Sequence, residues 1–222
     1  MARPARYTLA QIQRQALEIV DQEGLAGLSM RSLAAALHTG PMTLYNYCDG
    51  REGLEELVVD AVAALVPRTE PTDDWVADAR TAATALWSTV REHPAAIPLI
   101  LTRRTSSPGA LAPAEALAAA LARSGRTGFD LLVAFRVVMG FVTGIAQSEL
   151  AGPLTSGSDP GAEADRVRTV ASDANPTLAA LAAMAGADAH REFEEGLTLI
   201  LAGLGPEPSA QEGHRGSRAA PR

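Results

Sequence analysis

One short segment near the N-terminus carries four side chains that can form hydrogen bonds with a binding partner. They are Thr43, Tyr45, Asn46 and Tyr47. A protein core would not select these polar tips, whereas Leu44 among them suits an inward-facing position. A short helix with an apolar inner edge and a polar, aromatic outer edge fits the major groove of B-DNA, where base edges present donors and acceptors.

The residues before this segment predict a helix and a tight turn that would position it. Ser29 is suited to cap a helix, since its hydroxyl can accept an otherwise unpaired backbone N–H. An apolar face follows at helical spacing: Met30, Leu33, Ala34 and Leu37. His38-Thr39-Gly40 breaks the run, and the fixed φ of Pro41 suits the first turn of a second helix. Asp49-Gly50 ends that helix, and Arg51 stands at the head of the next one.

This order of residues resembles the helix-turn-helix of TetR-family transcriptional repressors, over roughly fifty N-terminal residues. The resemblance rests on Leu33-Ala34, Leu37, Thr43-Leu44-Tyr45, Tyr47 and the pair Arg51 and Leu54. Two residues depart from the family pattern. His38 stands where the family usually has Gly, which predicts a slightly strained turn. Cys48 stands where the family usually has an aromatic residue, and its side chain fills less of the core.

The resemblance implies a DNA-binding set on this segment. Thr43, Asn46 and Tyr47 would face the bases, and Pro41 and Met42 would approach base methyl groups. Tyr45 and Arg51 would each bind a phosphate, and Arg31 would reach a phosphate or a guanine edge. The alternative is a solvated polar face on a three-helix module.

Composition sets limits on the fold class and on the partners. The chain has 222 residues, 47% of them hydrophobic and only 4% aromatic, and Ala and Leu dominate, which predicts an all-α fold. A net charge of −7 argues against a general nucleic-acid coat protein but not against a small specific reader. One cysteine excludes an internal disulfide, and we expect a cytoplasmic protein without a membrane span or a signal peptide.

The chain divides into four predicted parts. Residues 1–51 form a three-helix DNA-binding domain, 52–67 a connecting helix, 68–205 an effector-binding and dimerisation domain, and 206–222 a disordered tail. The predicted helices span 9–23, 30–37, 42–47, 51–66, 75–93, a kinked segment 95–104, 110–123, 127–150, 163–173, 176–185 and 188–203. Residues 152–162 are expected to form a flexible loop.

Two long apolar helices downstream predict a homodimer. A DNA reader this small makes few contacts, so specificity usually needs two copies on a palindrome. Helices 127–150 and 188–203 would supply the dimer surface, and Phe193→Arg or Leu197→Arg would then disrupt it. The alternative is that these helices bury each other within one chain.

The region 75–147 could hold a small, mainly apolar effector. Its predicted lining is Trp87, Ile100, Leu101, Phe135, Met139, Thr143 and Gln147. Ordinary core packing is the alternative for each of them.

A weaker resemblance, from Asp74 to Gly152, is to the effector domain of the tetracycline-repressor subgroup. Those repressors hold a drug–magnesium chelate through a histidine and an acidic residue, whose places here fall on Ile100 and Ser148. Isoleucine cannot ligate a hard cation, so we expect no metal and no cofactor.

No set of residues for catalysis stands out. The histidines are scattered, Cys48 lacks the context of a nucleophile, and His190 with Glu194 fits a solvated ion pair better than a metal site. We therefore expect a ligand-responsive repressor that binds a palindromic operator as a homodimer and is released by a small molecule. An all-α enzyme, and a helical interaction or ligand-binding protein that has lost DNA binding, are the alternatives.

Overall fold

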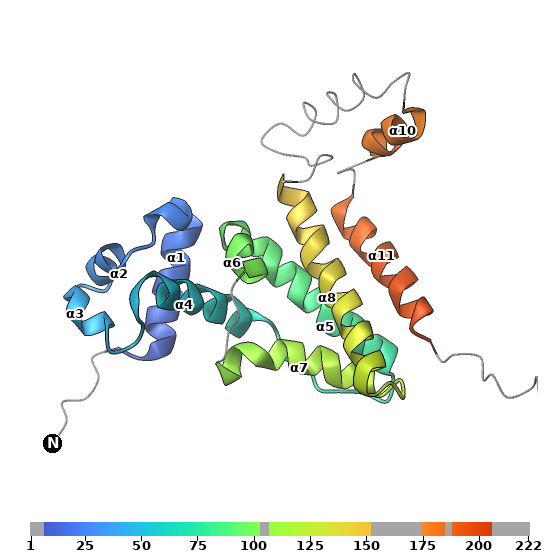
Figure 1. Cartoon of the computed structure of the whole chain (residues 1–222), viewed down its shortest axis with the longest axis horizontal. Helices are drawn as coiled ribbons and strands as arrows, with labels where there is room; N and C mark the ends of the chain where they lie inside the picture. The colour runs from blue at the N-terminus through green and yellow to red at the C-terminus, as the bar shows by residue number, and fades with distance from the viewer. Residues whose placement is uncertain (1–6, 103–106, 152–174, 185–187, 206–222) are drawn as a thin grey trace, which may run out of the picture.

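The computed structural model describes residues 7–102, 107–151, 175–184 and 188–205, and within them it contains helices and no strand. In chain order the helices are α1 (Leu9–Gly27), α2 (Met30–Ala36), α3 (Pro41–Leu44), α4 (Gly50–Leu65), α5 (Trp75–Glu92), η1 (Pro94–Ala96), α6 (Ile97–Thr102), α7 (Pro108–Ala122), α8 (Gly128–Ala151), α10 (Pro176–Met184) and α11 (Ala189–Gly203). Figure 1 shows α1–α3 at one end of the molecule and α8 with α11 toward the other. The all-α prediction is confirmed.

Side-chain caps fix the start of several helices. The Thr8 hydroxyl accepts from the backbone N–H of Gln11, whose side chain accepts from the N–H of Thr8. Ser29 and Ser32 make the same reciprocal pair at α2. Asp74 caps α5 by accepting from two backbone N–H groups. Each cap satisfies donors that the first helical turn leaves unpaired.

The predicted boundaries hold with small differences. Gly24 was expected to end the first helix; it interrupts α1 with φ 70°, and a last helical stretch continues to Gly27. The helix predicted at 42–47 is shorter in the structure: α3 ends at Leu44, and a hydrogen-bonded turn follows. The loop 152–162, the helix 163–173 and the tail from 206 lie outside the described residues.

One hydrophobic cluster supports the N-terminal helices. Residues of α1, α2, α3 and α4 build it, with Ile12, Leu33, Leu44 and Val58 fully buried. Ala96 and Leu99 also belong to it, although they follow α5 and lie beyond the predicted domain boundary near residue 68. The N-terminal helical module therefore takes part of its core from residues downstream in the chain.

A second cluster joins α5, α7, α8 and α11. Trp87, Phe193, Leu117 and Leu121 are among its largest buried side chains. Ile97 belongs to this cluster, and Ile100 packs against both clusters. The short η1–α6 segment thus contributes side chains alternately to the two cores.

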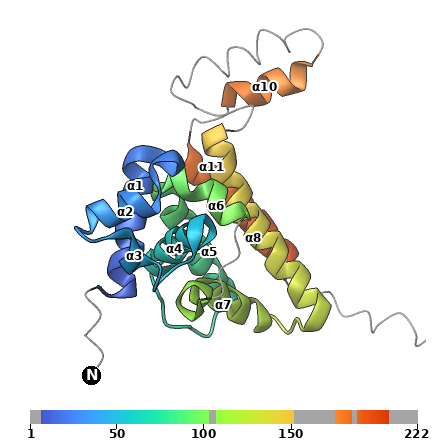
Figure 2. The same ribbon diagram turned by 60° about the vertical axis from the view of Figure 1, so that its left-hand side comes forward.

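Helix α8 is the one segment of the described residues that bears on the expectation of no membrane span. Residues Gly128–Ser148 are long and apolar enough to cross a membrane by length and composition, with 28% of that stretch buried. One such helix is weak evidence, because the core helix of a soluble protein passes the same test. Here one side of α8 packs against α5, α7 and α11, and Figure 2 shows it beside α11.

Candidate nucleic-acid interface and effector region

The turn between α2 and α3 has the geometry of a helix-turn-helix. His38 adopts φ 50°, the left-handed conformation that the sequence predicted to be strained. The backbone N–H of Thr39 donates to the Ala34 carbonyl, and the Thr39 hydroxyl donates to the Thr43 hydroxyl at 3.2 Å. Leu44 is fully buried, so α3 is held with its other side toward solvent.

Most of the predicted DNA-binding residues share this outer surface. Pro41, Met42, Tyr45 and Asn46 are exposed, and so is Arg31 on α2; Thr43 is half-buried. Met42 is 77% exposed and Tyr45 is 49% exposed. Both residues are therefore accessible to a binding partner.

Tyr47 occupies a different place from the one predicted. It is half-buried against the first cluster, and its hydroxyl donates to the backbone carbonyl of Tyr7 at 2.8 Å. The Tyr7 hydroxyl in turn donates to the Leu37 carbonyl. Tyr47 therefore ties the start of the described chain to the ends of α2 and α3, and in this geometry its hydroxyl is engaged within the chain.

Arg51 is engaged within the chain. Its Nε donates to Glu55 at 2.6 Å, and its two terminal nitrogens donate to the carbonyls of Leu28 at 2.5 Å and Leu25 at 2.9 Å. A guanidinium has five N–H donors, so two remain for a phosphate. The geometry favours a positioning role, in which Arg51 ties α4 to the α1–α2 junction.

The predicted effector residues separate into two groups. Trp87 is buried, and Ile100, Phe135 and Met139 are half-buried against the second cluster. The half-buried Thr143 donates its hydroxyl proton to the Met139 carbonyl at 2.8 Å. Leu101 and Gln147 are exposed, so the structure does not bring them into the same core.

The predicted effector residues do not line either of two cavities found among the described residues. One, of ≈ 320 Å³, lies between the α4–α5 connector, α5 and α7; its lining is Val66, Pro67, Arg68, Thr69, Glu70, Ala82, Ala112, Pro113, Glu115 and Ala116. The other, of ≈ 390 Å³, is an open depression on α11. Composition gave no indication of the connector cavity.

The residues considered for metal binding and catalysis have structural partners. Glu194 pairs with Arg80 at 2.9 Å, and the His190 ring lies 5.7 Å from that of Trp87. Ser148 donates its hydroxyl proton to the Ile145 carbonyl. Burial, with the charge of Asp49 as a smaller cause, raises the pKa of the Cys48 thiol and so disfavours a nucleophilic thiolate. Among the described residues, no three His, Cys, Asp or Glu side chains are grouped to hold a metal ion.

Comparison with known proteins identifies the family. Residues 66–206 match the family model described as "Tetracyclin repressor-like, C-terminal domain". The chain belongs to the TetR family of transcriptional regulators. This TetR-family chain thus carries the helix-turn-helix geometry of α2 and α3 next to a matching C-terminal domain.

Two curated relatives share sequence with this TetR-family protein. It is 34% identical to the HTH-type transcriptional repressor DrrR1 of Streptomyces coeruleorubidus over 67% of its own length, and the match spans 57% of DrrR1. It is 30% identical to an HTH-type transcriptional regulator of Saccharopolyspora erythraea, over 85% of this chain and 80% of that protein.

The fold is similar to that of ActR from Streptomyces coelicolor, a TetR family protein. Its complex with (S)-DNPA superposes with a TM-score of 0.74 at 29% identity, covering 90% of this chain and 98% of ActR. The complex of ActR with actinorhodin gives 0.72 at 30% identity, covering 90% and 97%.

Proposed function

We propose that this protein is a homodimeric repressor that binds a palindromic DNA operator through α3 and is released by a mainly apolar small molecule. The observation that carries the DNA-binding part is the outer surface of α3 and of the turn that follows it. Met42, Tyr45 and Asn46 are exposed there while Leu44 anchors the helix from behind. Membership of the TetR family supports the same role.

The base-reading set is Pro41, Met42, Thr43 and Asn46, with Arg31 on the neighbouring helix. Tyr45 donates its hydroxyl to a phosphate, and Arg51 and Tyr47 hold the reader in place. Apolar groups such as Met42 suit contact with thymine methyl groups, and the Asn46 amide suits adenine. Each lost base contact is worth roughly 1–3 kcal/mol of discrimination.

The outer face of α8 is the surface proposed for pairing with a second copy. Its exposed apolar side chains are Phe129, Leu132, Val133 and Val137. A methyl group added at Gly140 or Gly144 meets nothing within 4 Å, so another helix can approach this face closely. Leu199 on α11 is also 77% exposed.

The position of this face also argues for a second copy as its occupant. Figures 1 and 2 place α8 and α11 away from α2 and α3, so pairing through α8 leaves both readers free for DNA. Two recognition helices on one side of a dimer would meet half-sites about 34 Å apart, one turn of B-DNA.

The effector is proposed to be small, mainly apolar and bound without a metal. The buried ring of Trp87 and the half-buried Phe135 and Met139 offer apolar contacts in the effector domain. ActR, a relative of similar fold, is described in complex with actinorhodin. Such a ligand would bias one of two orientations of the readers and thereby oppose operator binding. The place of action is the cytoplasm.

Selection from random double-stranded DNA tests this function. The purified protein should enrich an inverted repeat, and Met42→Ala should change the enriched half-site. The exposed Thr81 gives a matched control, since Thr81→Ala on α5 should enrich the parent sequence. Enrichment of nothing above a non-specific background would reject DNA reading and favour the helical interaction protein.

The effector part is tested separately on the operator complex. Adding tetracycline with and without magnesium should leave the complex intact, whereas an apolar polycyclic aromatic compound should release DNA without magnesium. Release by tetracycline only when magnesium is present would contradict the metal-free proposal. Chemical turnover of a bound compound would instead revive the enzyme alternative.

A further inference from the structure

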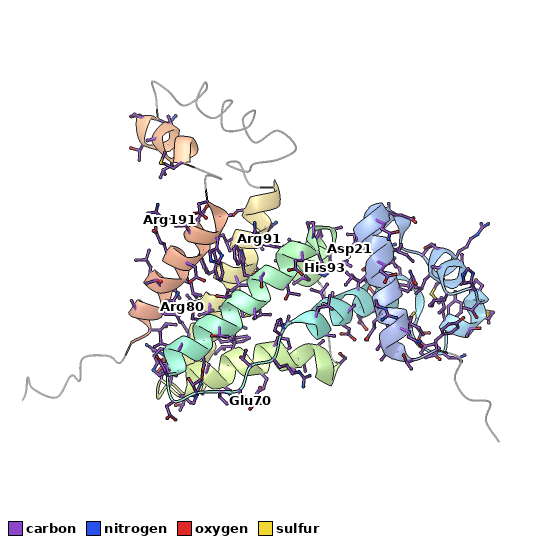
Figure 3. The ribbon with its side chains drawn as sticks, turned by 180° about the vertical axis from the view of Figure 1, so that it is seen from behind. Asp21, Glu70, Arg80, Arg91, His93 and Arg191 are labelled. Carbon is purple, nitrogen blue, oxygen red and sulfur yellow. The ribbon has the colours of Figure 1, made fainter. Side chains whose placement is uncertain are left out.

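A polar contact joins the two halves of the molecule outside both hydrophobic clusters. Nδ1 of His93, at the end of α5, lies 2.8 Å from Oδ2 of Asp21 on α1. Their side chains are only 15% and 31% exposed. An ionised carboxylate can only accept, so Nδ1 carries the shared proton. Figure 3 shows the two side chains meeting between α1 and the end of α5.

The backbone on either side holds the imidazole of His93 in place. The His93 N–H donates to the Val90 carbonyl at 3.2 Å, and the His93 carbonyl accepts from Ala96 at 3.0 Å. Ala96 is fully buried in the cluster that supports α1. The hydrogen bond therefore restricts the relative orientation of α1 and η1, which also share a hydrophobic contact. A hydrogen bond requires a defined angle, whereas hydrophobic burial does not.

The same end of α5 reaches into the effector domain. Trp87 lies six residues before His93 and stacks on Phe193 of α11. Arg91 lies between Trp87 and His93 in the sequence, and its guanidinium carbon is 4.6 Å from the centre of the Trp87 ring. Less than two turns of one helix thus carry both a buried contact of the effector domain and the contact to α1.

We propose that the Asp21–His93 pair is a latch that sets the orientation of the DNA-binding module relative to the effector domain. The consequence for operator binding rests on the proposed function. With the latch closed, each chain presents α3 at one angle, and the dimer accepts one half-site spacing. With the latch removed, the hydrophobic contact at Ala96 remains but permits a wider range of angles.

The latch is tested first without DNA. Spin labels at Ala36→Cys on α2 and Thr81→Cys on α5, both exposed positions, report the distance between the two halves in a Cys48→Ala background. Labelled chains are diluted with unlabelled protein so that pairs within one chain dominate. Asp21→Ala and His93→Ala should each broaden the distance distribution, and the double variant should broaden it no further.

Two matched variants separate the latch from a general loss of stability. His93→Asn keeps an N–H donor near the place of Nδ1 and should restore the narrow distribution. Glu92→Gln changes the exposed neighbour of His93 and should leave the distribution as in the parent. A distribution that stays narrow in Asp21→Ala and His93→Ala would overturn the latch, whatever the DNA result.

The operator measurement then follows. Asp21→Ala should weaken binding to the enriched operator roughly threefold to tenfold. It should also bind operators with one or two base pairs added between half-sites nearly as well as the original, whereas the parent discriminates. The salt slope of binding should not change, because no phosphate contact is lost. If the parent binds no operator while the distance distribution broadens, the proposed function fails and the latch stands. Unchanged spacing selectivity in a broadened variant would overturn the role of the latch in operator binding.

Discussion

The rings of Trp87 and Phe193 stack with their centroids 4.2 Å apart and their planes 5° from parallel. Phe141 of α8 stacks on Phe193 at 5.6 Å, and an added methyl group at Gly196 would lie 2.5 Å from the Phe141 ring. The sequence predicted that Phe193 and Leu197 face a partner chain. Both are instead fully buried within their own chain, so the alternative of mutual burial holds for this face.

Phe193→Ala should therefore lower the free energy of unfolding of the effector domain. It should not convert a dimer to monomers. Removing a fully buried phenylalanine costs about 3–5 kcal/mol of unfolding free energy, including the cavity left behind. Urea unfolding followed by circular dichroism measures the loss. Glu192→Gln, on the exposed side of the same helix, should stay within about 0.5 kcal/mol of the parent.

The oligomeric state should respond to the opposite face. Val137→Arg places a charge in the exposed apolar stripe of α8 and should give a folded monomer with unchanged helical content. Light scattering at micromolar concentration measures the mass. A monomer mass for the parent would contradict the dimer, and sedimentation of the parent with lipid vesicles would show a membrane as the occupant.

The two tyrosines near α3 should behave differently when their hydroxyls are removed. Tyr45→Phe should weaken DNA binding without changing the melting temperature, since the exposed hydroxyl has its proposed partner only on DNA. Tyr47→Phe should cost about 0.5–1.5 kcal/mol of stability by removing the bond to the Tyr7 carbonyl, with the operator preference unchanged. A changed preference in Tyr47→Phe would restore its predicted base-reading role.

Arg51→Ala should act on stability first. It removes three hydrogen bonds, among them the ion pair with the buried Glu55 carboxylate, which should cost about 1–3 kcal/mol. The double variant Arg51→Ala/Glu55→Ala should be more stable than Arg51→Ala alone, because it no longer contains a buried carboxylate whose ion pair has been removed. A fall in the salt slope of DNA binding by about one phosphate, with stability unchanged, would indicate the phosphate role instead.

Acid should weaken the attachment of the α4–α5 connector. Hydrogen bonding from Arg123, with further bonds from Thr72, lowers the pKa of Asp78 below its ordinary 3.8. A depressed carboxyl pKa adds stability above the unfolded value, and that stability is lost as pH falls through the folded value. Asp78→Asn should therefore be less stable than the parent near pH 6, and the difference should shrink below pH 3.8. A difference that stays constant across this range would contradict the assignment.

Local rules predicted most helices and the exposed positions of several residues on α2, α3 and the turn after α3. The caps at Thr8 and Ser29 and the left-handed His38 depend on neighbours a few residues away, so the sequence contains them. The bond from Tyr47 to Tyr7 and those from Arg51 to Leu25 and Leu28 join distant parts of the chain; helical periodicity carries no information about them. The sequence therefore did not indicate the intrachain contacts that Tyr47 and Arg51 make.

Helix α8 shows a second limit of sequence patterns. Apolar residues surround most of it, so periodicity could not say which face meets its own chain. The structure buries Ala134, Val138 and Val142 and leaves Val133 and Val137 exposed. The effector residues were likewise predicted from residue type alone, and Leu101 and Gln147 lie outside the core for that reason.

The placement of Ala96 and Leu99 in the N-terminal core has a consequence for chimeric regulators. A recombinant that joins residues 1–67 to a foreign effector domain also replaces these two side chains, which close the core beneath α1 and α4. Grafted readers should then lose solubility unless the foreign segment supplies side chains of matching volume. The N-terminal helices and the effector domain should therefore not be freely exchangeable between proteins. Functional hybrids should come from crossovers that keep the η1–α6 residues together with the N-terminal helices of the same parent.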